Sequence, residues 1–125
     1  MALTNEEKIS ALKSITALDV DCGLKNVMNM APVYLRILGV FVKNARKDKE
    51  QLDEFAKATD LDGFGVLIHG YKSSLKNVGA LDLGDAAAAL EAADTNADTA
   101  FIMANLPTFT SSIEDLASKI EQILE

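Results

Sequence analysis

The sequence is poor in several residue types, and each shortage excludes a class of protein or site. Among its 125 residues are one cysteine, one histidine, two prolines and no tryptophan. The single cysteine, Cys22, rules out an internal disulfide framework and favours a reducing compartment. The single histidine excludes zinc sites built from several histidines. Because aromatic residues make up only 6% of the chain, aliphatic side chains must supply most of the core.

Positive charge and long apolar runs are also scarce. The 12 lysine and arginine residues are outnumbered by 19 aspartate and glutamate residues, which gives a formal net charge of −7. Nucleic-acid binding normally needs a basic face, so this balance argues against it. No apolar run reaches the roughly 18–20 residues of a membrane span, and the opening MALTNEEKIS lacks the apolar core of a signal peptide. We therefore expect a soluble, cytoplasmic protein without a nucleic-acid or membrane partner.

What the sequence does contain is helical patterning. With 49% hydrophobic and 25% charged residues, the composition fits one globular domain spanning 1–125. No segment combines β-branched enrichment with strict alternation, so we predict no strands. The periodicity predicts an all-α protein, an antiparallel four-helix bundle with a short extra N-terminal helix. The expected ranges are about 4–16 for the N-terminal helix, a turn-like stretch at 18–23, a small helical segment around 24–28, and bundle helices at about 32–57, 62–78, 83–93 and 97–124.

Local signals set the ends of these helices. Thr4 followed by Glu7 has the pattern of a capping box for the first helix. Asp60 or Asp62 can cap the helix over 62–78, and a glycine at 79 can end it. Pro107 must kink or split the last helix, because it removes a helical hydrogen bond; a serine at 111 offers a fresh cap if the helix splits. The apolar stripe expected along this last helix contains Phe101, Asn105, Phe109, Ile113, Leu116, Ile120 and Ile123.

The single histidine, His69, is predicted to face solvent. The apolar stripe of its helix is centred about 140° away around the helix axis, at about 100° per residue. Its helical neighbours are small or cationic, namely Gly65, Lys72, Ser73 and Lys76. A phosphoryl acceptor needs such surroundings: an accessible nitrogen, room for a bulky partner, and cations to offset the negative charge that it gains. The plainer interpretation is a solvated histidine among lysines.

A longer motif favours the first interpretation. The segment His69-Gly-Tyr-Lys-Ser-Ser-Leu-Lys-Asn-Val-Gly79-Ala80 resembles the signature of histidine-containing phosphotransfer (HPt) domains, with lysine at +3, small residues at +4 to +6 and Gly-Ala at +10 and +11. Leu18-Asp-Val-Asp-Cys-Gly-Leu-Lys, Tyr34-Leu-Arg-Ile-Leu and Leu90-Glu-Ala-Ala also look like parts of this family. The resemblance covers most of residues 18–93 and weakens in the final helix.

This resemblance implies a four-helix bundle whose exposed histidine shuttles phosphoryl groups between aspartates of receiver domains. His69 would be the phosphorylated residue and Lys72 the cation beside it. Gly65 and Ser73 would form a floor of small residues on which a receiver domain docks, and helical geometry adds Lys76 to that surface. The family often has leucine where this chain has Tyr71, and glycine in place of Ser73, which bears on partner fit.

Other interpretations remain open. The runner-up is a helical docking module that binds a receiver or kinase domain without accepting phosphate. Asp94, Asn96 and Asp98 have the spacing of three calcium ligands, but the later ligands of such a loop are missing, so helix capping explains them better. No glycine-rich phosphate loop with lysine is present, so we expect no ATP chemistry and no turnover of the protein's own. We expect a monomer without cofactor or metal.

Overall fold

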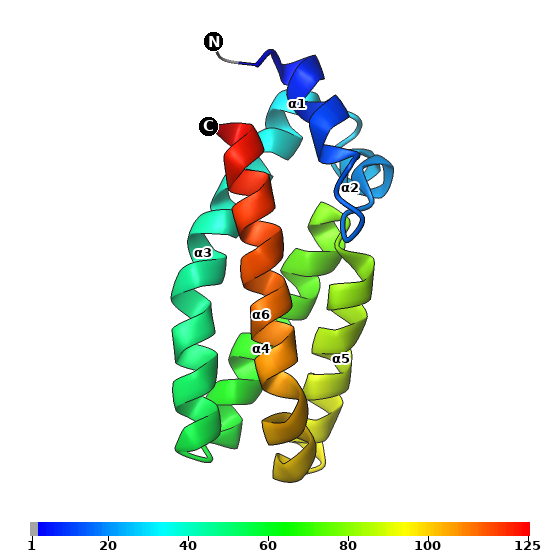
Figure 1. The fold of residues 1–125 in the computed structure, drawn as a ribbon. Coiled ribbons are helices and arrows are strands. Elements are labelled where there is room, and N and C mark those ends of the chain that lie inside the picture. Colours follow the sequence, from blue (N-terminus) through cyan, green and yellow to red (C-terminus); the bar gives the residue numbers. More distant parts are fainter. Residues whose placement is uncertain (1–2) are drawn as a thin grey trace.

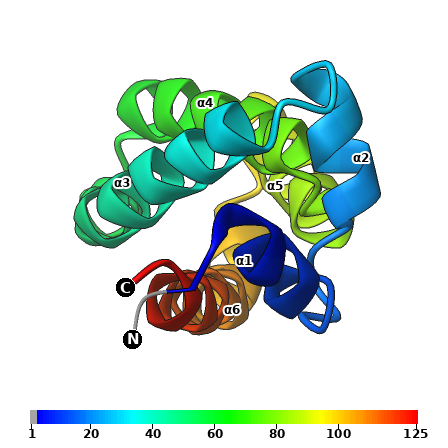
Figure 2. The same cartoon turned by 90° about the horizontal axis from the view of Figure 1, so that it is seen from above.

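The computed structural model describes residues 3–125, which form six α-helices and confirm the predicted all-α bundle. Four long helices, α3 to α6, run side by side in alternating directions, and α1 and α2 lie against one end of them (Figures 1 and 2). None of the helices in this part of the chain combines the length and apolar character that a membrane crossing needs. Their bounds are α1 Asn5–Leu12, α2 Val20–Asn26, α3 Ala31–Lys57, α4 Leu61–Val78, α5 Leu81–Thr95 and α6 Thr99–Leu124.

Side-chain caps start three helices where the sequence indicates. Thr4 and Glu7 form the reciprocal capping box of α1. Asp60 accepts a hydrogen bond from the amide of Gly63 at the start of α4. Asp98 likewise caps α6, as the capping interpretation predicts for this residue.

The prediction was wrong for the segment that forms α2. The stretch expected to be turn-like contains the start of this helix, because Asp19 accepts a hydrogen bond from the amide of Cys22 and caps it. The helix then ends at Asn26, and the next residues leave it through Met28, whose φ of 57° is left-handed. The short helix therefore lies several residues earlier than expected.

Other helix ends also differ from the expected ranges, since α5 continues to Thr95 and α6 begins only at Thr99. The first helix stops at Leu12, since the amides of Ser14 and Ile15 donate to carbonyls only three residues back and tighten the chain into a turn. The helix expected from 83 begins at Leu81. Its early start follows from Gly79, whose φ of 96° reverses the chain within two residues.

The last helix does not split at Pro107, and no new helix starts at Ser111. Pro107 is exposed, so its ring displaces no core side chain. On the buried side, the hydroxyl of Thr110 donates to the carbonyls of Leu106 at 3.1 Å and Pro107 at 3.2 Å. Because Leu106 and Phe109 are both buried in the same core, packing holds the two halves of α6 together across the proline.

The predicted core stripe of α6 was wrong before Pro107. Ile102 and Leu106 are buried, whereas Phe101 is 37% exposed and Asn105 is exposed. Two successive steps of four residues, from 101 to 109, drift by about 80° around a helix, whereas a step of seven drifts by only about 20°. Ile102 therefore shares a face with Phe109 and Phe101 does not.

One cluster of buried residues draws on all six helices. At the end covered by α2, the hydroxyl of Tyr34 donates to the carbonyl of Val78 at 2.8 Å, and the amide of Asp19 donates to the carbonyl of Gly79 at 2.8 Å. A Cβ on Gly23 would lie 2.4 Å from the Tyr34 ring, so glycine is what allows α2 to approach. These contacts fix the end of α4 that follows the histidine.

Candidate functional site

His69 lies near the middle of α4 and faces away from the core. Its side chain is 63% exposed, while the residue before it, Ile68, is fully buried. The exposure predicted from helical spacing is therefore observed. Burial of Phe64, Ile68, Tyr71 and Leu75 on the other side of α4 turns His69 outward.

A carboxylate from the neighbouring helix binds both His69 and Lys72. Oε2 of Glu91, on α5, lies 2.5 Å from Nδ1 of His69. The other oxygen of the same carboxylate, Oε1, accepts a hydrogen bond from Nζ of Lys72 at 2.6 Å. The imidazole and the ammonium group are thus joined through one side chain of α5.

This bridge determines which ring nitrogen is available. The hydrogen bond from Lys72, and after it the contact with His69, hold the pKa of Glu91 below its ordinary value, so the carboxylate is ionised at neutral pH. An ionised carboxylate can only accept hydrogen bonds, so Nδ1 of His69 must carry the hydrogen. In the neutral ring, Nε2 then keeps a free lone pair and can act as a nucleophile.

Sequence reasoning missed Glu91. It lies 22 residues after His69, and no local motif links an acidic residue at that distance to the histidine. The available signal was its place next to Leu90, a predicted core position of α5, which puts Glu91 at the margin of the buried face. Which helix that margin meets depends on packing.

The other residues singled out in the sequence lie around this group in different settings. Ser73 is exposed one turn after His69. Lys76 forms an ion pair with Asp85 of α5 at 3.2 Å, and its stem packs over Gly84. Its ammonium group is therefore engaged with α5.

Gly65 is half-buried where α4 meets Asp94 of α5. A Cβ at this position would lie 2.3 Å from Oδ2 of Asp94. Partial burial, and after it the charges of Asp62, Asp60 and Glu91, raise the pKa of Asp94. Acidic side chains therefore gather on the side of His69 towards the start of α4, and Lys72 and Lys76 on the other side. Among residues 3–125, no three histidine, cysteine, aspartate or glutamate side chains are grouped so that they could hold a metal ion.

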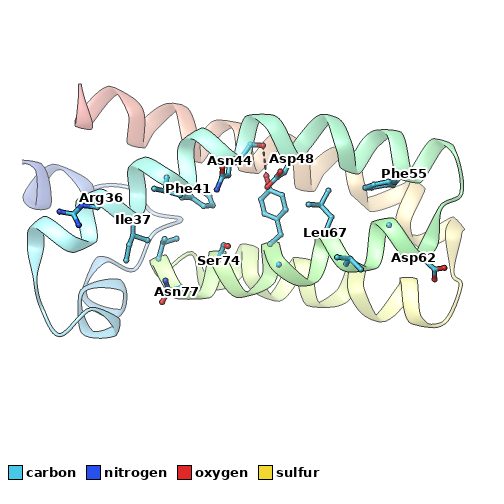
Figure 3. A pocket seen from close by; sticks show the side chains of 17 residues that line it. Arg36, Ile37, Phe41, Asn44, Asp48, Phe55, Asp62, Leu67, Ser74 and Asn77 are labelled. Carbon is cyan, nitrogen blue, oxygen red and sulfur yellow. Dashed lines mark hydrogen bonds between the residues drawn. The ribbon is translucent and has the colours of Figure 1, made fainter.

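Tyr71 fills the place where the HPt signature often has leucine. Its ring is buried and packs edge-to-face on Phe109, with ring centroids 6.2 Å apart. Its hydroxyl donates to the carbonyl of Ala45 at 2.9 Å, so the polar end of the buried side chain has a hydrogen-bond partner (Figure 3). The tyrosine therefore preserves the apolar packing of a leucine and adds a hydrogen bond between α3 and α4.

Fold and site together define a class: a helical bundle that presents one solvent-exposed histidine held by a carboxylate of the next helix. Comparison with family models agrees, since the model described as Hpt domain matches residues 36–125. This match includes the whole of α4 to α6 and most of α3, so the chain belongs to the HPt domain family. Neither the search of curated proteins nor that of solved structures gave a significant match. HPt domains are phosphotransfer modules of phosphorelays, and carry phosphoryl groups rather than catalyse turnover.

Proposed function

We propose that this protein carries a phosphoryl group on Nε2 of His69 and passes it between aspartates of receiver domains. The observation that carries the proposal is the contact between Nδ1 of His69 and Glu91 in an otherwise exposed side chain. It leaves Nε2 as the nucleophilic nitrogen and leaves it accessible to a partner. Membership of the HPt family supplies the reaction class.

The proposed transfer moves one phosphoryl group without an external oxidant or proton donor. The lone pair of Nε2 attacks phosphorus in the aspartyl phosphate of a receiver. A P–N bond forms as the P–O bond breaks, and the bonding electrons return to the receiver's aspartate as a carboxylate. Transfer to a second receiver follows the same path in reverse, with a new aspartate carboxylate as nucleophile. Because the protein only holds the group between two partners, it has no turnover of its own.

Lys72 and Glu91 have complementary roles in this proposal. Attack through Nε2 gives the ring positive character while Nδ1 keeps its hydrogen, and the Glu91 carboxylate at 2.5 Å stabilises that charge. Glu91 also fixes the ring orientation, so it is a positioning residue. Lys72 is a mobile point charge, held 2.6 Å from Glu91, that can turn to the phosphoryl oxygens as negative charge arrives.

We further propose that the receiver docks over the surface around His69. Ser73 is exposed and small, which allows close approach, and Lys76 adds positive charge. Gly65 contributes by keeping the α4 backbone close to Asp94 rather than by leaving open space. Action as a cytoplasmic monomer with receiver domains as partners is part of the same proposal.

The test is incubation with a receiver domain that has been phosphorylated beforehand. The expected product is a label that is lost in acid and kept in base, which is the behaviour of a phosphorus–nitrogen bond. His69→Gln should fold normally because the side chain is exposed. It should acquire no label because His69 is the only histidine in the chain. Retention of the label in His69→Gln would overturn the assignment of the phosphoacceptor.

The matched control is Ser111→Ala, an exposed change on α6, which should acquire label as the wild type does. If active receivers bind the wild-type protein but transfer no label, the protein is instead the docking module that accepts no phosphate. Binding is therefore measured alongside labelling, so that the two functions are separated in one experiment.

A further inference from the structure

The charge of Asp94, near the end of α5, has no role in the phosphotransfer proposed above. Its side chain lies at the same α4–α5 boundary as His69, because a Cβ on Gly65 would lie 2.3 Å from Oδ2 of Asp94. Gly65 comes one helical turn before His69 on α4, and Asp94 comes nearly one turn after Glu91 on α5. At a rise of about 1.5 Å per residue, Asp94 is therefore displaced by only about 5–6 Å along the helices from the contact between His69 and Glu91.

The carboxylate of Asp94 has no compensating partner within the bundle. Its Oδ1 atom is shielded from solvent and has no hydrogen-bond partner among residues 3–125. The two lysines of α4 form ion pairs with other acidic residues of α5, since Lys72 binds Glu91 and Lys76 binds Asp85. The positive charge at the α4–α5 boundary is thus engaged elsewhere.

The charges nearest to Asp94 are negative. Partial burial, and after it the charges of Asp62, Asp60 and Glu91, raise the pKa of its carboxyl group. A shielded oxygen without a donor, placed among like charges, reduces the stability of the folded protein. Such an unfavourable group calls for an explanation, and its place one turn from His69 suggests that the explanation lies in the reaction.

Phosphorylation of His69 would bring further negative charge to this boundary. The aspartate of the receiver keeps its own charge as a carboxylate when it leaves, so the transferred PO₃ group adds one negative charge to the protein. Lys72, one turn after His69, offsets that charge, whereas Asp94 opposes it from the other side. Because the boundary is partly buried, water screens this repulsion incompletely.

We propose that Asp94 weakens the hold of His69 on the phosphoryl group and so shifts the transfer equilibrium from phosphohistidine towards the receiver. This inference rests on the proposed phosphotransfer and adds the direction in which the protein biases it. Glu91 orients the imidazole through a contact with Nδ1, whereas Asp94 acts through its charge alone. Asp94 is therefore a residue that tunes the equilibrium rather than a catalytic residue.

The test measures how a phosphoryl group divides between the protein and a receiver domain at equilibrium. A radiolabelled phosphorylated receiver is mixed with the wild type or with Asp94→Asn, which has nearly the same shape and no charge. The label on each protein is then quantified, and spontaneous loss of label from each is followed in parallel and subtracted. Asp94→Asn should raise the equilibrium constant for transfer to the protein roughly threefold to tenfold.

The matched control is Asp82→Asn, which removes the same charge from the same helix. Asp82 is exposed in the first turn of α5, nine residues before Glu91. That separation is about 13–14 Å along the helix, which is longer than the distance of about 8–10 Å over which physiological salt screens exposed charges. The equilibrium constant of Asp82→Asn should therefore stay within about 1.5-fold of the wild-type value.

Two further measurements distinguish a tuning role from docking and from a structural role. The affinity of Asp94→Asn for the unphosphorylated receiver, measured by titration calorimetry, should stay within about twofold of the wild-type value, because the tuning role requires no contact with the receiver. The variant should also unfold at a urea concentration no lower than the wild type, because it loses an uncompensated charge.

Four outcomes would overturn the proposal. An unchanged equilibrium constant in Asp94→Asn is one, and an equal rise in Asp82→Asn is another. A loss of receiver affinity greater than about fivefold in Asp94→Asn would assign the residue to docking, and a lower urea midpoint would assign it to the fold. Failure of the proposed phosphotransfer is a separate result, since the wild-type protein would then acquire no label.

Discussion

The two sides of α4 are built differently. Towards α5 the helix is closely packed and carries charged side chains, with Glu91 joining His69 and Lys72 across the boundary. Towards α3 it borders an open apolar groove of about 830 Å³. One helix thus has a charged contact with α5, formed by His69, Lys72 and Glu91 and here called the polar seam, and an apolar groove on its α3 side.

The size of the side chains at each boundary explains the difference. Glycines at 65 and 84 let α5 approach so closely that a Cβ on either would collide with a side chain of the other helix. On the opposite side Phe41, Phe55 and Tyr71 line the space between α3 and α4 and keep the two helices apart. Small residues close one boundary and aromatic residues hold the other open.

The largest effect is expected where the closed side begins, at the turn between α4 and α5. Gly79→Ala places a side chain at φ 96°, and its Cβ would lie 2.1 Å from the carbonyl oxygen of Asp19. The new Cβ and the carbonyl oxygen are both held by the backbone of packed elements, so neither can shift without disturbing that packing. We expect a loss of about 2–4 kcal/mol in the free energy of unfolding, measured by urea denaturation. A loss below about 1 kcal/mol would show that this turn is not needed to close the α4–α5 boundary.

The next largest effect is expected at the polar seam. Lys72→Ala removes the cation that binds Glu91 and should slow phosphoryl transfer from a receiver by roughly tenfold to a hundredfold. The affinity for the receiver should change much less, because the rest of the docking surface is intact. Transfer is followed by quenched-flow labelling and affinity by titration calorimetry. Equal losses in rate and affinity would instead assign Lys72 to docking.

A smaller effect concerns the pH range over which Glu91 stays ionised and joins His69 to Lys72. The folded-state pKa of Glu91 is lowered, first by Lys72, so its contribution to stability is present above the unfolded pKa and is lost as the pH falls through the lower folded pKa. An NMR titration of the Glu91 carboxyl carbon should therefore have its midpoint below the ordinary value of 4.5. In Lys72→Ala this midpoint should rise towards 4.5, and an unchanged midpoint would contradict the assigned cause.

The smallest effect compares glycines on the two sides. Gly70→Ala adds a Cβ that meets nothing within 4 Å, so its helix propensity should stabilise the fold by roughly 0.5–1 kcal/mol. Gly65→Ala gains the same propensity, but its Cβ would lie 2.3 Å from Oδ2 of Asp94, which must move away. Gly65→Ala should therefore be less stable than Gly70→Ala in urea denaturation. The reverse order would mean that Asp94 can move away from a side chain at position 65 at little cost, so that α4 and α5 pack less tightly there than the distances indicate.

Much of the fold could be predicted because strong local signals mark it. The helix over 62–78 was placed within one residue, since Asp60 and Gly79 cap its two ends. The start of α2 was missed because a lone aspartate cap at Asp19 gives a weaker signal than a periodic apolar stripe. Of the two alternatives predicted at Pro107, a kink or a split, the split does not occur, because packing of Leu106 and Phe109 outweighs a lost hydrogen bond.

The sequence by itself determined that His69 is exposed and that Lys72 lies on the same side of the helix, because residues three apart on one helix are neighbours whatever surrounds it. It also carried the family signature around the histidine. Only the tertiary structure decided that Glu91 joins the two, and that a groove with Asp48 near its middle opens on the other side of α4. Both depend on how closely α4 packs against α5 and α3, and the distance between two helices is set by the size of every side chain at their contact rather than by any local pattern.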